Sequence, residues 1–244
     1  MALTNDDMAV REAAAAALAD ANNPAIIPAL LTALTGTDNF VLTSALNALK
    51  QFRDPRSKTP ALSLLHHADP HVRRQAVIVL GYLGEIDTLT DLGNLISTDP
   101  DNEVRRSAVG AIQFANAENI SPWLITALAD LHWQVRAEAA KGLGRLAIHS
   151  AHAELIHLLN DNAWQVVEQS ILALGALQNP AAISAIGSEL NHIMANVRKA
   201  VVSALGEIKH IDAIPYLQIA LQDADPDVRK IARWALHQVS THAS

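Results

Sequence analysis

The chain of 244 residues contains no cysteine. Disulfides, thiolate metal sites and a cysteine nucleophile are therefore excluded, and the redox state of the compartment stays open. Aromatic residues make up only 4% of the chain although half of its residues are apolar. Alanine and leucine supply most of the apolar content, which suits closely packed helices. Ten glycines and ten prolines are ordinary numbers, so the composition gives no sign of disorder.

Long apolar runs are missing as well. The most apolar short stretch, residues 76–83, is too short to span a bilayer, and the first ten residues lack the features of a signal peptide. We expect a soluble, cytoplasmic protein without a membrane segment. Eighteen basic and 25 acidic residues give a net charge of −7, which disfavours nucleic acid as a partner because a phosphate backbone requires a basic surface.

One pattern is repeated along the whole chain. A valine recurs every 31 residues, and the single spacing of 32 has its extra residue in the loop before Val104. Arginine usually follows the valine, alanine usually stands four positions after it, and leucine or isoleucine always stands eight positions after it. The eight valines are Val10, Val41, Val72, Val104, Val135, Val166, Val197 and Val228.

Each repeat predicts two helices. The first, which we call the Val-type helix, has apolar residues at the valine and at +4, +5 and +8, which is one helical face. The second, which we call the partner helix, opens with proline at Pro28, Pro122 and Pro215. Eight Val-type and seven partner helices, about fifteen in all, predict an all-α, curved solenoid of stacked hairpins in a single domain, 1–244. The units are expected near 6–37, 38–68, 69–98, 99–129, 130–160, 161–191, 192–222 and 223–244.

The turn aspartate, the Val-Arg pair, the alanine and the terminal Leu-Gly, as in VRRQAVIVLGYLG (72–84), resemble HEAT repeats. The period of 31 residues resembles the short HEAT-like type of phycobilisome (bilin) lyases. The resemblance covers nearly the whole chain and implies a solenoid with the Val-type helices on its concave side. Their small packing residues independently predict that the stack bends towards them. A repeat used for many tasks leaves the function open.

The positions at +2, +3 and +6 from each valine are free to vary and should point into the concave groove. They are mixed in character, so they are where specificity for a partner would lie. The candidate partner-binding residues are Arg74, Gln75, Arg106, Glu138, Lys141, Glu168, Lys199, Lys230 and Trp234.

The arginine at +1 predicts a structural ladder instead. Its recurrence in six of eight units favours pairing with turn acids such as Asp69, Asp101 or Asp225. Leu42 and Val167 interrupt the ladder, so we expect those two units to be held more loosely.

Trp133 and Trp164 occupy the same position in adjacent repeats. They form either an exposed aromatic rim for binding or a cover over the turn, and the sequence leaves both open. The eleven histidines include clusters at 66–71 and 149–157, but neither has the spacing of a zinc hydrolase, and we expect no metal site. HEAT-like deoxyhypusine hydroxylases hold two irons on His-Glu pairs, which this chain lacks at +2 and +3.

No phosphate loop or nucleophile motif is found, so the sequence predicts no catalytic residue and no cofactor. The leading hypothesis is a non-enzymatic scaffold that holds a segment or helix of another protein in the groove. The alternative, a bilin lyase or tetrapyrrole-handling chaperone, rests on the resemblance alone. A nucleic-acid binder like the HEAT-like DNA glycosylases ranks third. Ile231 and Trp234 further predict weak homodimerisation through the C-terminal repeat.

Overall fold

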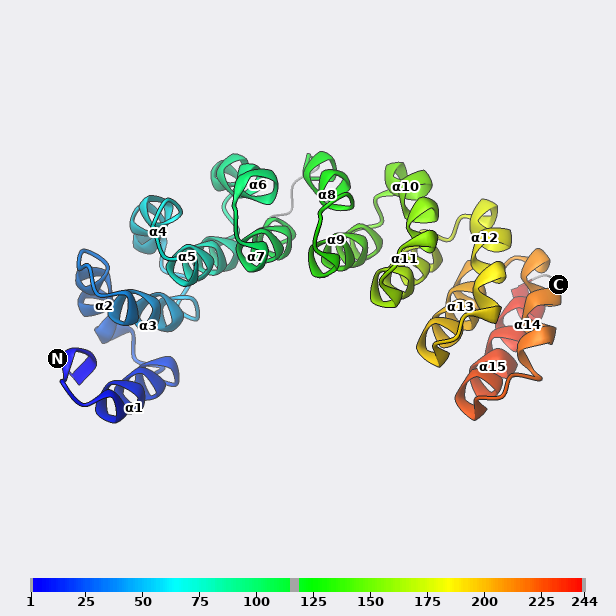
Figure 1. Cartoon of the computed structure of the whole chain (residues 1–244), viewed down its shortest axis with the longest axis horizontal. Helices are drawn as coiled ribbons and strands as arrows, with labels where there is room; N and C mark the ends of the chain where they lie inside the picture. Colours follow the sequence, from blue (N-terminus) through cyan, green and yellow to red (C-terminus); the bar gives the residue numbers. More distant parts are fainter. Residues whose placement is uncertain (1, 115–118, 243–244) are drawn as a thin grey trace. The chain divides into compact units, whose positions relative to one another are not determined.

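The computed structural model describes residues 2–114 and 119–242, and among these it contains fifteen α-helices and no strand (Figure 1). The all-α solenoid and its number of helices are therefore confirmed. The chain divides into two compact units, unit 1 at Met1–Ile120 and unit 2 at Ser121–Ser244. The grouping of all eight repeats into one domain stays a prediction.

Every expected Val-type helix is present. In unit 1 these helices are α1 (Met8–Ala19), α3 (Asn39–Leu49), α5 (Pro70–Leu83) and α7 (Asn102–Ile112). In unit 2 they are α9 (Trp133–Arg145), α11 (Trp164–Ala176), α13 (Ala195–Ile208) and α15 (Pro226–His242).

The seven partner helices are shorter and most follow a turn of 3-10 helix. They are α2 (Ile27–Ala33), α4 (Lys58–Leu64), α6 (Leu89–Thr98), α8 (Ser121–Ala127), α10 (His152–His157), α12 (Ile183–Ser188) and α14 (Ile214–Ala220).

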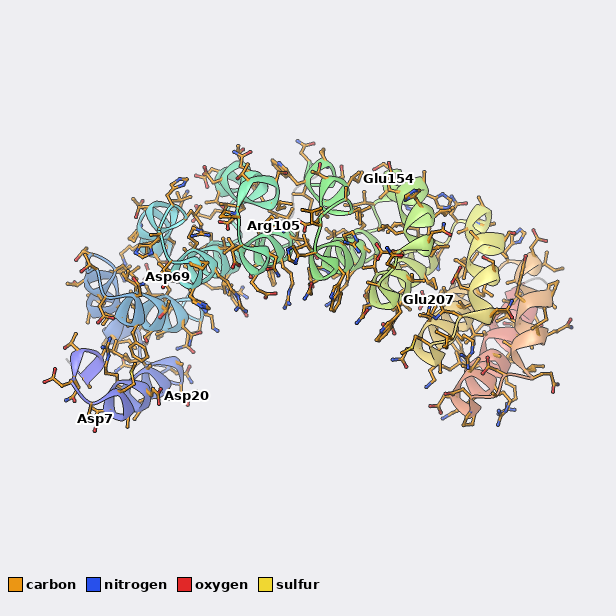
Figure 2. The ribbon with its side chains drawn as sticks, viewed as in Figure 1. Asp7, Asp20, Asp69, Arg105, Glu154 and Glu207 are labelled. Carbon is orange, nitrogen blue, oxygen red and sulfur yellow. The ribbon has the colours of Figure 1, made fainter. Side chains whose placement is uncertain are left out.

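Each unit, taken by itself, has two layers (Figure 1). The Val-type helices form one layer, which lies on the inner side of the bend within the unit, and the partner helices form the other. We call these the inner and outer layers. Figure 2 labels Glu154 on α10 of the outer layer and Glu207 on α13 of the inner layer.

Turn aspartates determine where several Val-type helices begin. Asp38, Asp69 and Asp101 are N-cap residues whose carboxylates accept hydrogen bonds from backbone N–H groups of the first turn. Asp69 lies in the turn between α4 and α5 (Figure 2). Behind the caps, the repeated valines close the core: Val72 and Val104 have no exposed surface. Val10 differs, because it is 40% exposed and α1 contains no buried residue.

Glycines at +9 let neighbouring inner helices approach closely. A Cβ atom added to Gly81 would lie 2.8 Å from the Cβ of Ala111 in the next repeat, and one on Gly144 would lie 2.6 Å from the Cα of Ala173. Gly175 and Gly206 repeat this contact with the alanine at +7 of the following helix. The sequence predicts that glycines mark the ends of the Val-type helices. Gly84 does so as a left-handed C-cap, with φ of 66°, whereas the glycines at +9 lie within their helices.

The arginine ladder is present, but its acids differ from those expected. Arg73 of α5 makes two 2.8 Å hydrogen bonds to Asp99, five residues before the next valine. Arg73 also donates to the carbonyl oxygens of His67 and Ala68 in its own turn, at 3.0 and 3.1 Å. Each such arginine therefore ties two consecutive turns together. The bidentate pairs of the ladder are Arg73–Asp99, Arg136–Asp161 and Arg198–Asp223.

The acids named from the sequence were wrong because they already have another role. Asp101 and Asp225 accept N–H bonds at the start of α7 and α15, as Asp69 does for α5. Arg11 instead pairs with a capping aspartate, Asp38, since Gly36 occupies the position of the usual acid.

Both interruptions of the ladder coincide with a histidine. Leu42 and Val167 are buried. The position of the ladder aspartate, five residues before the next valine, is occupied by His67 opposite Leu42 and by His192 opposite Val167. In each case the histidine Nδ1 accepts a backbone N–H two residues on, at 3.1 and 3.0 Å. The ladder aspartates accept the same bond, as Asp99 does from Asp101 N. Where no arginine is present, a histidine thus replaces the carboxylate and accepts the same backbone bond.

Candidate binding surface

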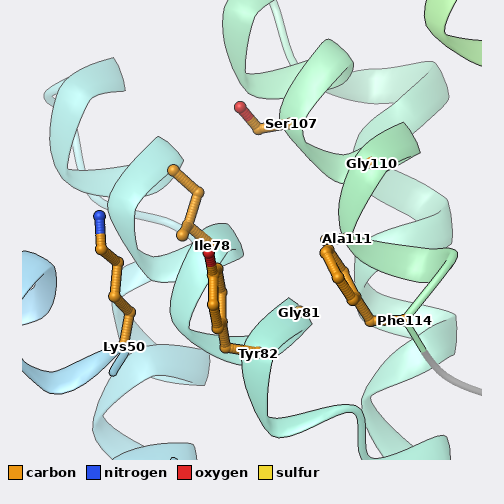
Figure 3. Close-up of a pocket in the computed structure, with 8 residues that line it drawn as sticks. All are labelled: Lys50, Ile78, Gly81, Tyr82, Ser107, Gly110, Ala111 and Phe114. Carbon is orange, nitrogen blue, oxygen red and sulfur yellow. The ribbon is translucent and has the colours of Figure 1, made fainter. Parts of the chain in front are cut away.

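The inner layer of unit 1 contains a pocket between α5 and α7. It encloses about 320 Å³. Gly81 and Ala111 form its floor, where the two helices touch (Figure 3). Its lining residues are Lys50, Ile78, Gly81, Tyr82, Ser107, Gly110, Ala111 and Phe114.

Two aromatic rings stand at one end of this pocket. Tyr82 and Phe114 stack with ring centroids 5.7 Å apart and an angle of 26° between the planes (Figure 3). The guanidinium of Arg53 lies 5.7 Å from the Tyr82 ring centroid, within the range of a cation–π contact. Tyr82 is 37% exposed and Phe114 57% exposed, so both rings are available to a ligand.

The sequence-predicted residues of unit 1 lie beside the pocket, one helical turn away. Arg74 and Gln75 lie in the second turn of α5, and each has one buried polar atom without a hydrogen-bond partner, Nε of Arg74 and Oε1 of Gln75. Arg106 lies at the same repeat position of α7, and its side chain is 3.4 Å from that of Glu103. These sequence-predicted residues thus lie next to an aromatic pocket that the sequence did not predict, and their role in binding stays a prediction.

Lys50, Tyr82 and Phe114 were missed because the sequence reasoning stopped at +6. They occupy +9 and +10, one further turn along the same helix face as +3 and +6. That spacing is a usable signal: large aromatics in an otherwise aromatic-poor chain stand at +10 in two consecutive repeats. We call the positions +2, +3, +6, +9 and +10 the inner columns.

The inner layer of unit 2 is different in charge. Glu138 and Glu168 stand on α9 and α11, and burial raises the pKa of the Glu168 carboxyl. Lys141 and Lys230 are exposed. Lys199 is held by the start of α15, since its Nζ lies 3.2 Å from an oxygen of Asp227, and this contact raises the pKa of Lys199.

The three tryptophans predicted to take part in binding lie on three different helices of unit 2. Trp234, on α15, is 51% exposed and its ring edge packs over Gly206. Trp133 and Trp164 are the first residues of α9 and α11. Trp133 is 38% exposed, while Trp164 is more covered. Their role as an aromatic rim stays a prediction.

A second, smaller pocket of about 210 Å³ lies in unit 2 beside the Arg136–Asp161 pair. His157 and Asn160 contribute to its lining. Because both charged groups are already satisfied by each other, this pocket offers little to a ligand beyond its shape.

Residues 2–114 and 119–242 contain neither a metal-binding cluster nor a membrane-spanning helix. They contain no cluster of three or more histidine and acidic side chains that could hold a metal ion. None of their helices combines the length and the apolar character needed to cross a bilayer.

Comparison with known proteins places the fold in a family. A family model described as HEAT repeats matches residues 1–65, 41–113, 121–192 and 187–244. A search of curated proteins finds no significant match.

Several solved structures share the fold. YibA of E. coli has a TM-score of 0.75 at 18% identity, over 98% of this chain and 90% of its own. An engineered protein has a TM-score of 0.61 at 22% identity, over 98% of this chain and 76% of its own. Yeast importin-beta (Kap95p) has a TM-score of 0.69 at 16% identity, and the match covers 99% of this chain but only 40% of the importin. Identities this low establish the fold alone.

Proposed function

The chain belongs to the HEAT-repeat family, and we propose that it is a non-enzymatic, cytoplasmic scaffold whose inner layer binds a segment or helix of another protein. HEAT solenoids are typical of protein-interaction scaffolds. The phycobilisome-lyase subtype suggested by the sequence is not needed for this proposal.

One observation carries the proposal. Apart from the packing glycines at +9, the residues that hold the repeats together and the residues of the inner columns are largely different sets. Valines, small residues and ladder arginines are buried or paired, whereas Arg74, Lys141 and Trp234 are used by neither the core nor the ladder. These residues form a surface that the packing of the repeats does not require. It contains exposed aromatics and arginines, the residue types in which protein-binding hot spots are enriched.

Charge reversal tests the proposal. Arg74, Arg106 and Lys141 are changed together to Glu, and binding of a partner purified from the native host is measured by titration. We expect at least a tenfold loss of affinity, since two or three rim charges each change the binding free energy by about 0.5–1 kcal/mol or more when reversed.

The matched control reverses three cations outside the inner columns, Arg56, Lys209 and Arg233. The control should bind as the parent does, and circular dichroism should show both variants folded. A partner that binds the triple variant of Arg74, Arg106 and Lys141 with the affinity of the parent would show that the inner layer is not the binding surface.

A tetrapyrrole-handling role is a second candidate. The observation that favours it is the stacked pair Tyr82 and Phe114 beside the ammonium of Lys50, because linear tetrapyrroles are flat and carry propionates. Co-expression with a linear tetrapyrrole should then give a coloured protein, and a colourless product would contradict this role.

Self-association through α15 is a further part of the proposal. Trp234 presents an exposed ring there. Light scattering should show a mass that rises with concentration, and Trp234→Ala should abolish the rise. A constant monomer mass at high concentration would end this part of the proposal.

A further inference from the structure

Three of the four inner helices of unit 1 carry charge of one sign. In the inner columns of α3, α5 and α7 the charged residues are Lys50, Arg74 and Arg106, and no aspartate or glutamate occurs there. Arg53, in the loop after α3, adds a fourth cation against the Tyr82 ring. Such a group of cations stands out in a chain with a net charge of −7.

These cations differ from the ladder arginines in how fully they are paired. Lys50 and Arg74 have no ion pair within the described part of the chain, and the Nε of Arg74 is buried without an acceptor. Arg106 has only the 3.4 Å contact with Glu103, whose side chain is 36% exposed. By contrast, Arg73 makes bonds of 2.8 Å to a carboxylate that is 2% exposed. Lys50 and Arg74 therefore keep terminal hydrogen-bond donors that no carboxylate of the described residues uses.

Apolar and aromatic surface lies among these cations. Ile78 and Tyr82 of α5 face Phe114 of α7 across the pocket, while Lys50 flanks it from α3 (Figure 3). The pocket volume of about 320 Å³ exceeds that of a single large side chain. An apolar slot with cations around it is complementary to an apolar side chain with carboxylates around it.

We propose that the inner layer of unit 1 binds an acidic polypeptide segment through α3, α5 and α7, with an aromatic side chain of the segment packed against Ile78, Tyr82 and Phe114. Lys50, Arg53 and Arg74 pair with its acidic residues. This inference rests on the proposed scaffold function and specifies the chemistry of the partner for one of the two units. The aromatic side chain supplies most of the affinity, and the charges orient the segment and speed its association.

Single-stranded nucleic acid is the main competing ligand, since stacking rings beside cations also suit it. The observations favour a peptide for two reasons. The cations of α3, α5 and α7 are few and are not continued on α1, whose inner columns carry Glu12 and Asp20. The pocket is also lined mainly by apolar and small residues around Tyr82 and Phe114, with Lys50 as its one cation, whereas a nucleic-acid backbone requires a row of cations along its path.

The test uses four fluorescein-labelled probes and fluorescence anisotropy with the full chain. The first is a twelve-residue peptide with a central Trp flanked by Asp and Glu. The second replaces that Trp with Ala, the third replaces the acids with Lys, and the fourth is oligo(U). We expect the first probe to bind in the micromolar range, about tenfold more tightly than the second, and we expect the third and fourth not to bind.

Two double variants localise the binding. Tyr82→Ala with Phe114→Ala should weaken the first probe about tenfold and remove its preference over the Ala peptide. Lys50→Gln with Arg74→Gln should weaken it about fivefold and flatten its salt dependence. The controls are Ile219→Ala, an exposed apolar residue of the outer layer, and Arg56→Gln, an exposed cation outside the inner columns. Both controls should bind as the parent does. All four substituted inner residues are at the surface, so the fold should survive.

The inference is overturned if none of the probes binds at millimolar concentration, if the basic peptide or oligo(U) binds best, or if the inner variants bind like the controls. If the proposed scaffold function is wrong, the result is different: the affinity of a host partner does not change when Arg74, Arg106 and Lys141 are reversed together. A partner that responds only to Lys141, on unit 2, would keep the scaffold function and refute the acidic segment on unit 1.

Discussion

Arg136 and Arg11 occupy the same position of the repeat but face different carboxylates. Arg136 pairs with Asp161, whose side chain is 7% exposed, and Arg11 pairs with Asp38, which is 45% exposed. Removing the arginine leaves a buried charge in the first case and a hydrated one in the second. We predict that Arg136→Leu lowers the free energy of unfolding by about 3 kcal/mol, and Arg11→Leu by less than about 1 kcal/mol.

Urea unfolding of the two variants measures this difference. Asp161→Leu combined with Arg136→Leu is the control, because removing both charges should recover much of the loss. Equal losses for Arg136→Leu and Arg11→Leu would show that the ladder is not stabilised by burial of its acids.

The buried carboxyl of Glu168 predicts that the stability of the fold falls as the pH rises. Burial raises the pKa of its carboxyl above the ordinary 4.5, so the protonated form is favoured in the folded state. That contribution is complete below pH 4.5 and is lost as the pH rises through the folded pKa. Glu168→Gln should therefore raise Tm by about 1–2 °C at pH 7 and change it little at pH 4.

Asp223 provides the matched contrast in the same pH series. The hydrogen bond from Arg198 lowers the pKa of Asp223 below the ordinary 3.8 despite its burial. Its contribution is present above pH 3.8 and is lost as the pH falls through the folded pKa. Asp223→Asn should lower Tm at pH 7, and the loss should shrink below pH 3.8. The same pH trend for both variants would contradict the assigned environments.

At the scale of the helix, the spacing of the inner layer depends on glycine. Gly144 of α9 touches the backbone of Ala173 on α11, and an added Cβ would come within 2.6 Å of it. We predict that Gly144→Ala destabilises the chain by about 1–3 kcal/mol, because the two helices must move apart. Thermal unfolding measures the loss.

Gly36 is the control for this substitution. Its added Cβ would meet its nearest neighbour at 3.4 Å, and its φ is not positive. Gly36→Ala should be neutral or slightly stabilising because it reduces the freedom of the unfolded chain. A loss at Gly36 as large as that at Gly144 would mean that helix spacing is not the cause.

A histidine stands opposite each residue that interrupts the ladder, which predicts that substitutions at the two positions have coupled effects on stability. Val167→Arg alone places a guanidinium opposite His192, and His192→Asp alone places a carboxylate opposite Val167. Together they recreate the pair seen at Arg198 and Asp223. A double-mutant cycle should give a favourable coupling of about 1–3 kcal/mol. Additive effects would show that the histidine is unrelated to the missing arginine.

Much of the frame could be predicted from the sequence because it repeats. The valine spacing gave all fifteen helices, and the proline positions gave the start of α2, α8 and α14. The acids of the ladder could not be chosen from the sequence alone. Asp99 and Asp101 stand two residues apart in the same turn, and only their geometry separates the arginine partner from the helix cap.

The binding surface was predictable only in part, because it does not repeat. Arg74 and Arg106 were found through their column, whereas Tyr82 and Phe114 share their column with Arg145, Ala176 and Glu207 in unit 2. Contents this mixed do not mark the whole column, and the signal that remains is the pair of aromatics at +10 in two consecutive repeats. The pocket exists only where two aromatics fall in consecutive repeats and their helices meet through Gly81.

At the scale of the whole molecule, each of the two compact units has its own inner layer and its own charge. Unit 1 presents cations and an aromatic pocket, while unit 2 presents Glu138, Glu168 and Lys141. The proposed scaffold would then recognise one partner through segments of different chemistry, or two partners. Both possibilities require the inner layer to be the contact surface.

Site-specific photo-crosslinking in the native host tests that requirement most directly. A photo-reactive phenylalanine analogue replaces one serine at a time, Ser107 or Ser203 on the inner layer and Ser63 or Ser184 on the outer layer, two in each unit. The account predicts a discrete crosslinked partner from the inner positions and none from the outer ones. Crosslinks that arise equally or preferentially from Ser63 and Ser184 would contradict it.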